Sequence, residues 1–204
     1  MSKEEIIPEA SNHAAPIGEV PDAAAAGVPV YKGWRKPEVL LIVMAAAMPL
    51  SFSTWMALLN NFSIEMADFT GREIGILQSL REIPGFLAFT AIFVLLVLRE
   101  QTFALLSLLV LGIGVAISGY FPTVIGLYCT TVLMSIGFHY FETMQQALSL
   151  QWVKKERTAM VMGKQLSAKS ISSLVMFGVV WLMLEIFDVD YRYVYLFGGA
   201  LTVI

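Results

Sequence analysis

The sequence predicts an all-α protein, a polytopic bundle of transmembrane helices. Of its 204 residues, 57% are hydrophobic and only 14% are charged, whereas an average soluble domain carries about 25% charged residues. The mean hydropathy is +0.73. The apolar residues form six segments, of which five have about the length that a helix needs to cross a bilayer core. Short connections between the segments favour antiparallel neighbours.

The first 36 residues differ from the rest of the chain. They are rich in Ala, Pro, Gly and Glu and show no hydrophobic period. They also lack the basic start, apolar run and cleavage site of a signal peptide. Such a composition buries too little apolar surface to offset the entropy of ordering, so residues 1–36 are predicted to form a disordered cytoplasmic tail.

The first three predicted helices cover residues 37–59, 73–98 and 102–119. The first has no ionisable residue past Glu38, and the third has none at all. The second contains Arg81 and Glu82, followed by Pro84 and Gly85, which should loosen the helix at that depth and favour a kink or hinge. Because charge inside a membrane is costly, the charge-free third helix is expected to face lipid.

The fourth and fifth predicted helices cover residues 122–150 and 158–187. The fourth contains His139 and Glu142, and the fifth contains Lys164 and Lys169. A sixth helix begins near Tyr193 and shows only about twelve residues, fewer than a span requires. We therefore expect residues 37–204 to be an N-terminal transmembrane bundle that is incomplete at its C-terminus.

Basic residues predict the orientation, because they stay in the cytoplasm. With the N-terminus inside, seven basic residues flank the inner ends of the helices and two flank the outer ends. We expect a multi-pass protein of a bacterial inner (plasma) membrane, with a cytoplasmic N-terminus. The inner residues are Lys32, Arg35, Lys36, Arg99, Lys154, Lys155 and Arg157, and the outer ones are Arg72 and Arg192.

Several classes of function are disfavoured by the composition. The net charge of −3 argues against a nucleic-acid partner, which needs a basic face. The two histidines lie far apart and Cys129 is the single cysteine, so neither a metal site nor a disulfide framework is expected. No Gly-x-x-x-x-Gly-Lys-Ser/Thr motif occurs, so neither ATP nor another cofactor is expected.

The fourth predicted helix carries a polar stripe. Its members are spaced by three or four residues, which places them on one face of a helix. Such a stripe serves either to hydrogen-bond neighbouring helices or to line a cavity or proton path. An imidazole and a carboxylate three residues apart at depth favour the second reading. The stripe consists of Ser135, His139, Glu142, Gln146 and Ser149.

Other charged residues lie near the membrane midplane. Lys169 is about 18 Å from the inner edge at 1.5 Å per residue, which suits a functional role. Arg81 and Glu82 point about 100° apart on a helix, so each is expected to need its own partner, either on another helix or in a substrate. Lys164 is shallower and lies level with Glu142 when residues are counted from the turn, which makes it the expected ion-pair partner of Glu142.

A resemblance to a known family rests on the stretch KKERTAMVMGKQLSAKSISSLVMFG, residues 154–178. It shows the basic–acidic–Arg turn at Arg157 and the small residues of the following helix. Together with the six helices, the inside N-terminus and the charge-free third helix, it makes the chain resemble the N-terminal half of a major facilitator superfamily transporter. The resemblance implies half of a twelve-helix fold, with helices 1, 2, 4 and 5 lining a cavity shared with a missing C-terminal half.

The loop between the second and third helices departs from that family. The family pattern is Gly-x-x-x-Asp-Arg-x-Gly-Arg-Arg, whereas this chain has only Leu-Arg-Glu-Gln-Thr at residues 98–102. Arg99 can stand for one basic position, but the Asp and the glycines are absent. The chain is therefore an atypical member by this resemblance.

The function expected from these features is secondary active transport of a small polar solute by alternating access, coupled to protons. The deep groups Arg81, Lys164 and Lys169 outnumber Glu82 and Glu142 by one charge, which favours an anionic or zwitterionic solute. Glu142 is the carboxylate expected to change protonation during the cycle. The alternatives are an oligomeric six-helix channel or scaffold subunit and, less favoured, a membrane-embedded enzyme. Because no nucleophile–base or metal-ligand cluster is readable, the protein is not expected to be an enzyme.

The topology can be tested with single cysteines in a Cys129→Ser background. A cysteine at position 188 should react with an impermeant thiol reagent added outside intact cells. A cysteine at position 155 should react only after the cells are permeabilised. Labelling of position 155 but not of position 188 from outside would reverse the orientation.

Overall fold

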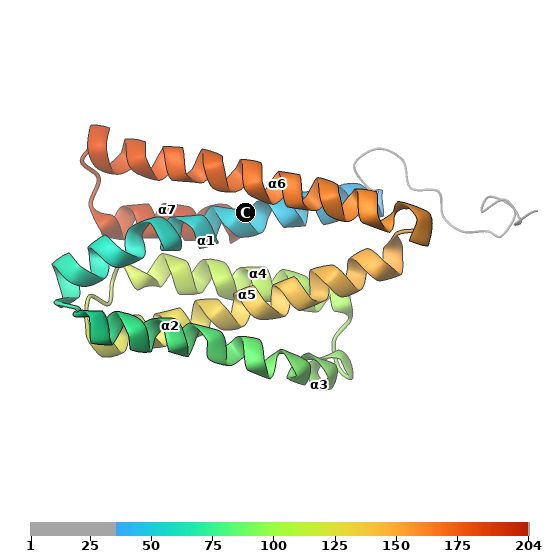
Figure 1. Ribbon diagram of the computed structural model, residues 1–204, viewed down its shortest axis with the longest axis horizontal. Coiled ribbons are helices and arrows are strands. Elements are labelled where there is room, and N and C mark those ends of the chain that lie inside the picture. The colour runs from blue at the N-terminus through green and yellow to red at the C-terminus, as the bar shows by residue number, and fades with distance from the viewer. Residues whose placement is uncertain (1–35, 204) are drawn as a thin grey trace, which may run out of the picture. The chain divides into compact units, whose positions relative to one another are not determined.

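The computed structural model describes residues 36–203, and these form helices with no strand in that range (Figure 1). Residues 1–35 of the expected tail, 1–36, lie outside the described residues. The elements are α1 (Pro37–Ala67), α2 (Gly71–Phe86), the 3-10 segment η2 (Leu87–Thr90), α3 (Ala91–Leu95), α4 (Glu100–Ser118), α5 (Val124–Trp152), α6 (Lys155–Trp181), the π-helical segment η3 (Leu182–Ile186) and α7 (Tyr191–Val203).

Five helical stretches are long and apolar enough to cross a membrane. These are Pro37–Ala67, Gly71–Leu95, Glu100–Ser118, Val124–Trp152 and Lys155–Ile186. These five helices confirm the prediction of a membrane helix bundle. They support an integral membrane protein with several spans. The sixth predicted helix is α7, which has 13 residues in the described range.

The helices pack in two layers. α1 and α5 lie at the centre of one layer, with α6 packed against α1 and α2 packed against α5. α4 and α7 form the second layer and pack against α1, α5 and each other. α5 and α6 meet at the turn around residues 153–154 and diverge away from it (Figure 1). α4 and α7 cover one side of the layer that contains α1, α2, α5 and α6. The opposite side, which no described helix covers, is called the open face below.

Small residues let the two layers approach closely. A Cβ atom built on Gly137 of α5 would lie 2.3 Å from the backbone nitrogen of Leu111 in α4. A Cβ on Gly199 of α7 would lie 2.4 Å from the carbonyl oxygen of Gly112 in α4. In α1, Ser51 donates a hydrogen bond to Gly198 of α7 at 3.1 Å. These close contacts replace the hydrophobic effect, which does not drive helix association inside lipid.

The expectation that the third predicted helix faces lipid describes only one side of α4. Half of the residues in its most apolar stretch are buried among the described residues, against 11% in the Lys155–Ile186 span. Its buried side includes Ala104, Ser107 and Gly112, and its exposed side includes Leu105 and Leu109. The absence of charge reflects tight packing through small residues as much as contact with lipid.

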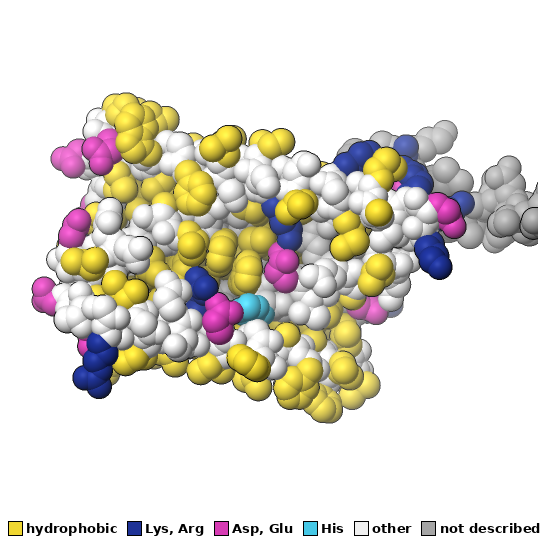
Figure 2. Space-filling model, in the orientation of Figure 1, with side chains coloured by type: hydrophobic (Ala, Val, Ile, Leu, Met, Phe, Trp, Pro, Cys, Tyr) yellow, Lys and Arg dark blue, Asp and Glu magenta, His cyan; other side chains and the backbone are white. Residues whose placement is uncertain are grey.

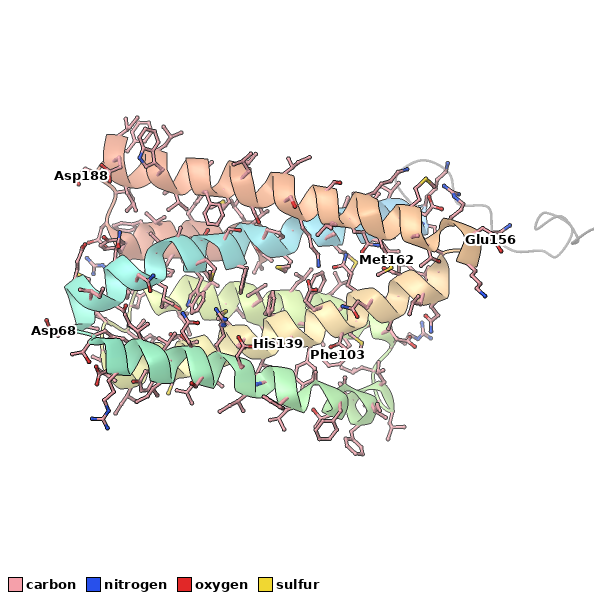
Figure 3. The ribbon with its side chains drawn as sticks, viewed as in Figure 1. Asp68, Phe103, His139, Glu156, Met162 and Asp188 are labelled. Carbon is pink, nitrogen blue, oxygen red and sulfur yellow. The ribbon has the colours of Figure 1, made fainter. Side chains whose placement is uncertain are left out.

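The helix boundaries differ from the predicted ones mainly at α1. It continues to Ala67, eight residues past the predicted end at Leu59, so the predicted outer loop near Asn61 is helical. It ends at Asp68, whose φ of 53° is left-handed. Asp68 and Asp188 lie at one end of the bundle and Glu156 lies at the other (Figure 3). The polar last turns of α1 extend the helix beyond its apolar stretch, which hydropathy alone does not reveal.

The close approach of α4 and α5 makes Gly137 intolerant of any side chain. We expect Gly137→Ala to lower the free energy of unfolding by about 1–3 kcal/mol, as overpacking does. Gly178→Ala on α6 is the matched control, because no atom lies within 4 Å of a Cβ built there. Thermal unfolding in detergent micelles measures both, and equal stability of Gly137→Ala and wild type would contradict this packing.

Candidate functional site

The charged residues at membrane depth gather on the open face of the bundle. Figure 2 shows two groups of charged side chains near the middle of this face, one of them with the only described histidine, His139. Lys169 is residue 15 of its 32-residue span, and Glu142 is residue 19 of its 29-residue span. Both positions lie within about 6 Å of the centre of their helices at 1.5 Å per residue.

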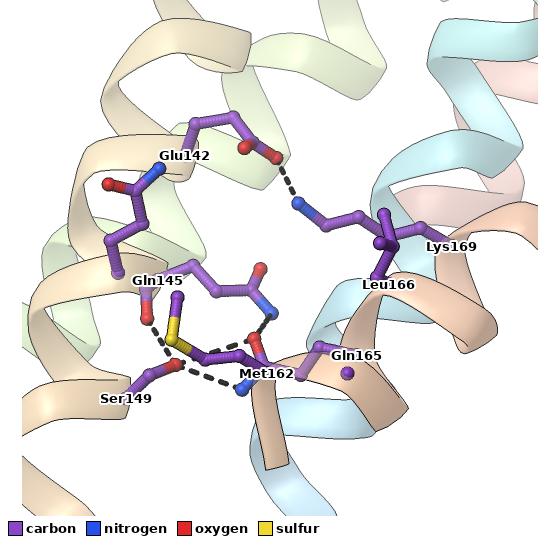
Figure 4. A pocket seen from close by; sticks show the side chains of 9 residues that line it. Glu142, Gln145, Ser149, Met162, Gln165, Leu166 and Lys169 are labelled. Carbon is purple, nitrogen blue, oxygen red and sulfur yellow. Dashed lines mark hydrogen bonds and ion pairs between the residues drawn. The ribbon is translucent and has the colours of Figure 1, made fainter. Parts of the chain in front are cut away.

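The first group is an ion pair between α5 and α6. Lys169 Nζ donates a hydrogen bond to Glu142 Oε1. The side chains remain 22% and 27% exposed, respectively. Because α5 and α6 diverge from their turn, the pair bridges the space between them (Figure 4). An ion pair at this depth keeps both charges compensated where an isolated charge is expensive.

The expected partner of Glu142 was Lys164, and this pairing is wrong. Lys164 is exposed and makes no hydrogen bond or ion pair among residues 36–203. Counting residues from the turn gives the height of a side chain along the helix but not its direction around it. Lys164 and Lys169 differ by about 140° in direction at 100° per residue. Lys169 shares a face with Gln165, four residues earlier, and that face meets α5.

A buried amide network lies between the ion pair and the turn. Gln145 Nε2 donates to the carbonyl oxygen of Leu41 in α1 and to Gln165 Oε1 in α6, both at 3.0 Å. Gln165 Nε2 donates to Ser149 Oγ at 2.9 Å. These bonds join α1, α5 and α6 near the closed end of the hairpin, and those among Gln145, Ser149 and Gln165 are dashed in Figure 4.

Gln146, which the sequence singled out, is not part of this network. It is exposed and makes no hydrogen bond within the described residues, whereas its neighbour Gln145 is 2% exposed. The two side chains differ by about 100° in direction. Gln145 lies three residues after Glu142 and four before Ser149, so it fits the spacing as well as Gln146 does and spacing alone did not distinguish the two. A signal was available, since Gln145 lies 8 residues before Val153 and Gln165 lies 11 residues after Lys154, which places the two amides within one helical turn of the same height.

A cavity of about 330 Å³ lies where α5 and α6 separate. The ion pair and the amide network both contribute to its wall, and Met162 of α6 lies on the side toward α5 (Figure 3). Its volume is near the lower end for small-molecule sites, which measure about 300–1,000 Å³. The lining residues are Glu142, Gln145, Gln146, Ser149, Met162, Gly163, Gln165, Leu166 and Lys169.

The second charged group joins α2 to α5 and α1. Arg81 Nη2 lies 2.7 Å from Glu82 Oε1, so these adjacent residues do pair, contrary to expectation. Backbone directions 100° apart do not prevent this, because the long Arg side chain folds back. The guanidinium also lies 5.9 Å from the centre of the Trp55 ring, within the range of a cation–π contact. His139 Nε2 lies 4.0 Å from Glu82 Oε2.

The backbone of α2 makes room for His139. A Cβ on Gly85 would lie 2.8 Å from the imidazole Cε1, so glycine allows the ring to sit against the helix. Ser135 donates a hydrogen bond to the carbonyl oxygen of Arg81. The 3-10 segment η2 begins two residues after Gly85. The predicted irregularity at Pro84–Gly85 is therefore present, displaced toward the C-terminal side.

The two arginines of the predicted cytoplasmic loops differ in their contacts. Arg157 Nη1 and Nη2 each lie 2.9 Å from a Glu38 carboxylate oxygen, a bidentate pair that joins the N-termini of α6 and α1. Arg99 precedes α4 and is exposed, with no side-chain bond within residues 36–203. Its neighbour Glu100 accepts a hydrogen bond from Gln151 at 3.2 Å.

Comparison of the chain with protein-family models, curated proteins and solved structures found no match. The likeness to the major facilitator superfamily thus rests on the residues of this chain alone. The function of the chain is therefore inferred from the charged groups and the cavity of the open face.

The amide network predicts different roles for two adjacent glutamines. Gln145→Leu should lower the free energy of unfolding by about 1–2 kcal/mol, because it removes the two buried hydrogen bonds that Gln145 Nε2 donates to the Leu41 carbonyl and to Gln165 Oε1. Gln146→Leu is the matched control on the same helix and should leave thermal stability unchanged. Thermal unfolding in detergent measures both, and equal losses would mean that the network does not hold the hairpin together.

Proposed function

We propose that the chain is part of a secondary active transporter, which moves a small polar solute across a membrane by alternating access and is coupled to protons. The observation that supports this best is the Glu142–Lys169 pair, which bridges two diverging helices at mid-depth and borders a cavity. Transporters bind their substrates near the bilayer midplane, where helices from different parts of the fold meet.

The partial exposure of the ion pair favours a binding role over a purely structural one. A pair that only fastens helices in a membrane gains from complete burial, since exposure to lipid leaves charge in a medium that cannot solvate it. Both side chains here are about one-quarter exposed toward the open face. Such a face needs either water or other protein next to it. A solute cavity supplies the first and a second helical half supplies the second.

The arrangement of the helices also supports alternating access. α5 and α6 are joined at one end by their turn and farther along by the ion pair, so breaking the pair removes a restraint on their separation. α2, on the other flank, contains Pro84 and is followed by the irregular η2 segment. Breaks of this kind permit a helix to bend without loss of its overall path. A proton or a solute that binds one arrangement better shifts the equilibrium toward it.

The layer order agrees with what the family resemblance implies. There, the helices that correspond to α1, α2, α5 and α6 line a central cavity shared with a second six-helix half. In this chain three of these four helices, α2, α5 and α6, carry the mid-depth charges, whereas α4 and α7 lie behind the layer and carry none at that depth. We therefore propose that the open face is closed by a C-terminal half of the same protein.

Glu142 and Lys169 should be required for uphill transport. We expect Glu142→Gln in the full-length protein to abolish proton-driven solute accumulation in proteoliposomes and to leave solute exchange partly intact. The reason is that a neutral amide still accepts a hydrogen bond but cannot take up a proton. Solute-induced proton flux, followed with a pH-sensitive dye across a panel of small polar solutes, identifies a transported solute and measures the effect.

Two further variants separate coupling from fastening. Lys164→Met removes an exposed lysine of the same helix and should leave accumulation unchanged. The double change Glu142→Gln and Lys169→Met removes both charges together. Recovery of both stability and uphill transport in the double variant would show that the pair only fastens the helices. Passive flux without accumulation in the wild type would favour the channel alternative.

A further inference from the structure

We propose that the cavity between α5 and α6 binds a zwitterionic solute, with its carboxylate on Lys169 and its ammonium group on Glu142. This inference rests on the proposed transport function and specifies the substrate class of the same site. It follows from the balance of charge on the open face, from the exchange of partners that the ion pair permits, and from an unpaired acceptor in the cavity wall.

The charge balance differs from the one that the sequence suggests. Lys164 lies nearer the helix end than Lys169 and makes no ion pair among residues 36–203, so it belongs to neither charged group. The remaining deep groups are Arg81 and Lys169 against Glu82 and Glu142, two charges of each sign, arranged as two ion pairs. The excess positive charge that favoured an anionic solute is therefore absent from the described site. Within the cavity wall the charged residues are Glu142 and Lys169 alone.

A zwitterion can replace the internal pair without leaving a charge uncompensated. When its carboxylate pairs with Lys169 and its ammonium group pairs with Glu142, two ion pairs with the solute replace the Glu142–Lys169 pair. The total charge at mid-depth stays zero. With Glu142 ionised, an anion would pair with Lys169 and leave Glu142 alone, and a cation would leave Lys169 alone. Removing one partner from a desolvated pair is far more costly than replacing both.

The wall near Glu142 also contains an unpaired acceptor, which a rotation of the Gln145 side chain would present to an ammonium group. Gln145 Oε1 is buried and has no hydrogen-bond partner among the described residues. In Figure 4 this amide oxygen faces the side of the cavity where Glu142 and Lys169 meet. An ammonium group has three N–H donors, so a carboxylate together with an amide oxygen suits it better than the carboxylate alone. Buried acceptors without a donor are uncommon in folded proteins.

The remainder of the cavity limits the size and character of the solute. Met162 and Leu166 provide apolar wall opposite the polar groups, and Gly163 leaves space between them. A volume of about 330 Å³ suits a molecule of roughly amino-acid size. The expected ligand thus carries a carboxylate and an ammonium group on a short carbon skeleton.

Three solutes of nearly the same shape test the charge requirement directly: leucine, leucinamide and 4-methylpentanoate, which are a zwitterion, a cation and an anion at a pH of about 6.5. Glycine and glutamine extend the test to other zwitterions. Affinities for the purified full-length protein are measured from the increase in melting temperature with concentration. We expect at least one zwitterion to bind about tenfold more tightly than either singly charged analogue.

Charge-neutralising variants should change the preference in opposite directions. Glu142→Gln removes the group that an anion leaves unpaired, so 4-methylpentanoate should gain relative to leucine. Lys169→Met should favour leucinamide in the same way, and Lys164→Met should leave the order unchanged. The order of the three affinities in the wild type tests the charge requirement even if a variant fails to fold.

Equal or tighter binding of the anion to the wild type would overturn the zwitterion site, as would the absence of binding by every zwitterion. Uptake assays with the same solutes keep this result separate from the transport proposal. Accumulation of 4-methylpentanoate without accumulation of any zwitterion would support the transport proposal and contradict the zwitterionic substrate class. Binding of a zwitterion without transport in any direction would support the zwitterion site and contradict the transport proposal.

Discussion

The cost of an uncompensated charge in a low-dielectric medium governs the organisation of this bundle. The four charged side chains nearest the middle of the described helices, Arg81, Glu82, Glu142 and Lys169, form two ion pairs on the open face. The helices behind that face avoid charge and approach one another through glycine, alanine and serine. The charged face and the charge-free layer behind it thus follow from the same constraint.

The two polar layers of the α5–α6 hairpin have different functions in this structure. Nearest the turn, Gln145, Gln165 and Ser149 are buried and connect three helices by neutral hydrogen bonds. Farther out, Glu142 and Lys169 are half-buried and held by charge. A neutral network is insensitive to a proton gradient, whereas a carboxylate is not. In the proposed transport cycle the neutral network is the fixed part of the hairpin, and the ion pair is the part that changes.

The sequence predicts heights along helices well and directions around them poorly. The five spans, the depth of Lys169 and the involvement of Glu142 follow from the rise per residue and from hydropathy. The partner of Glu142 and the role of Gln145 do not, because these depend on how each helix is rotated, and small residues such as Gly137 set that rotation through contacts with other helices. The pairing of Arg81 with Glu82 depends on how the long arginine side chain folds back, which the backbone directions of the two residues do not reveal.

The divergence of α5 and α6 from a common turn makes the hairpin a lever. Glu142 lies 10 residues from the turn end of α5, whereas Val124, at the far end, lies 28 residues from it. On α6 and its continuation, Lys169 lies 14 residues from Lys155, and Ile186 lies 31. For rigid arms, a change in angle that lengthens the Glu142–Lys169 gap by about 1 Å separates the far ends by about 2–3 Å, since displacement grows in proportion to helix length. The ends of α5 and η3 farthest from the turn are therefore the parts of the hairpin that a change in the Glu142–Lys169 distance displaces most.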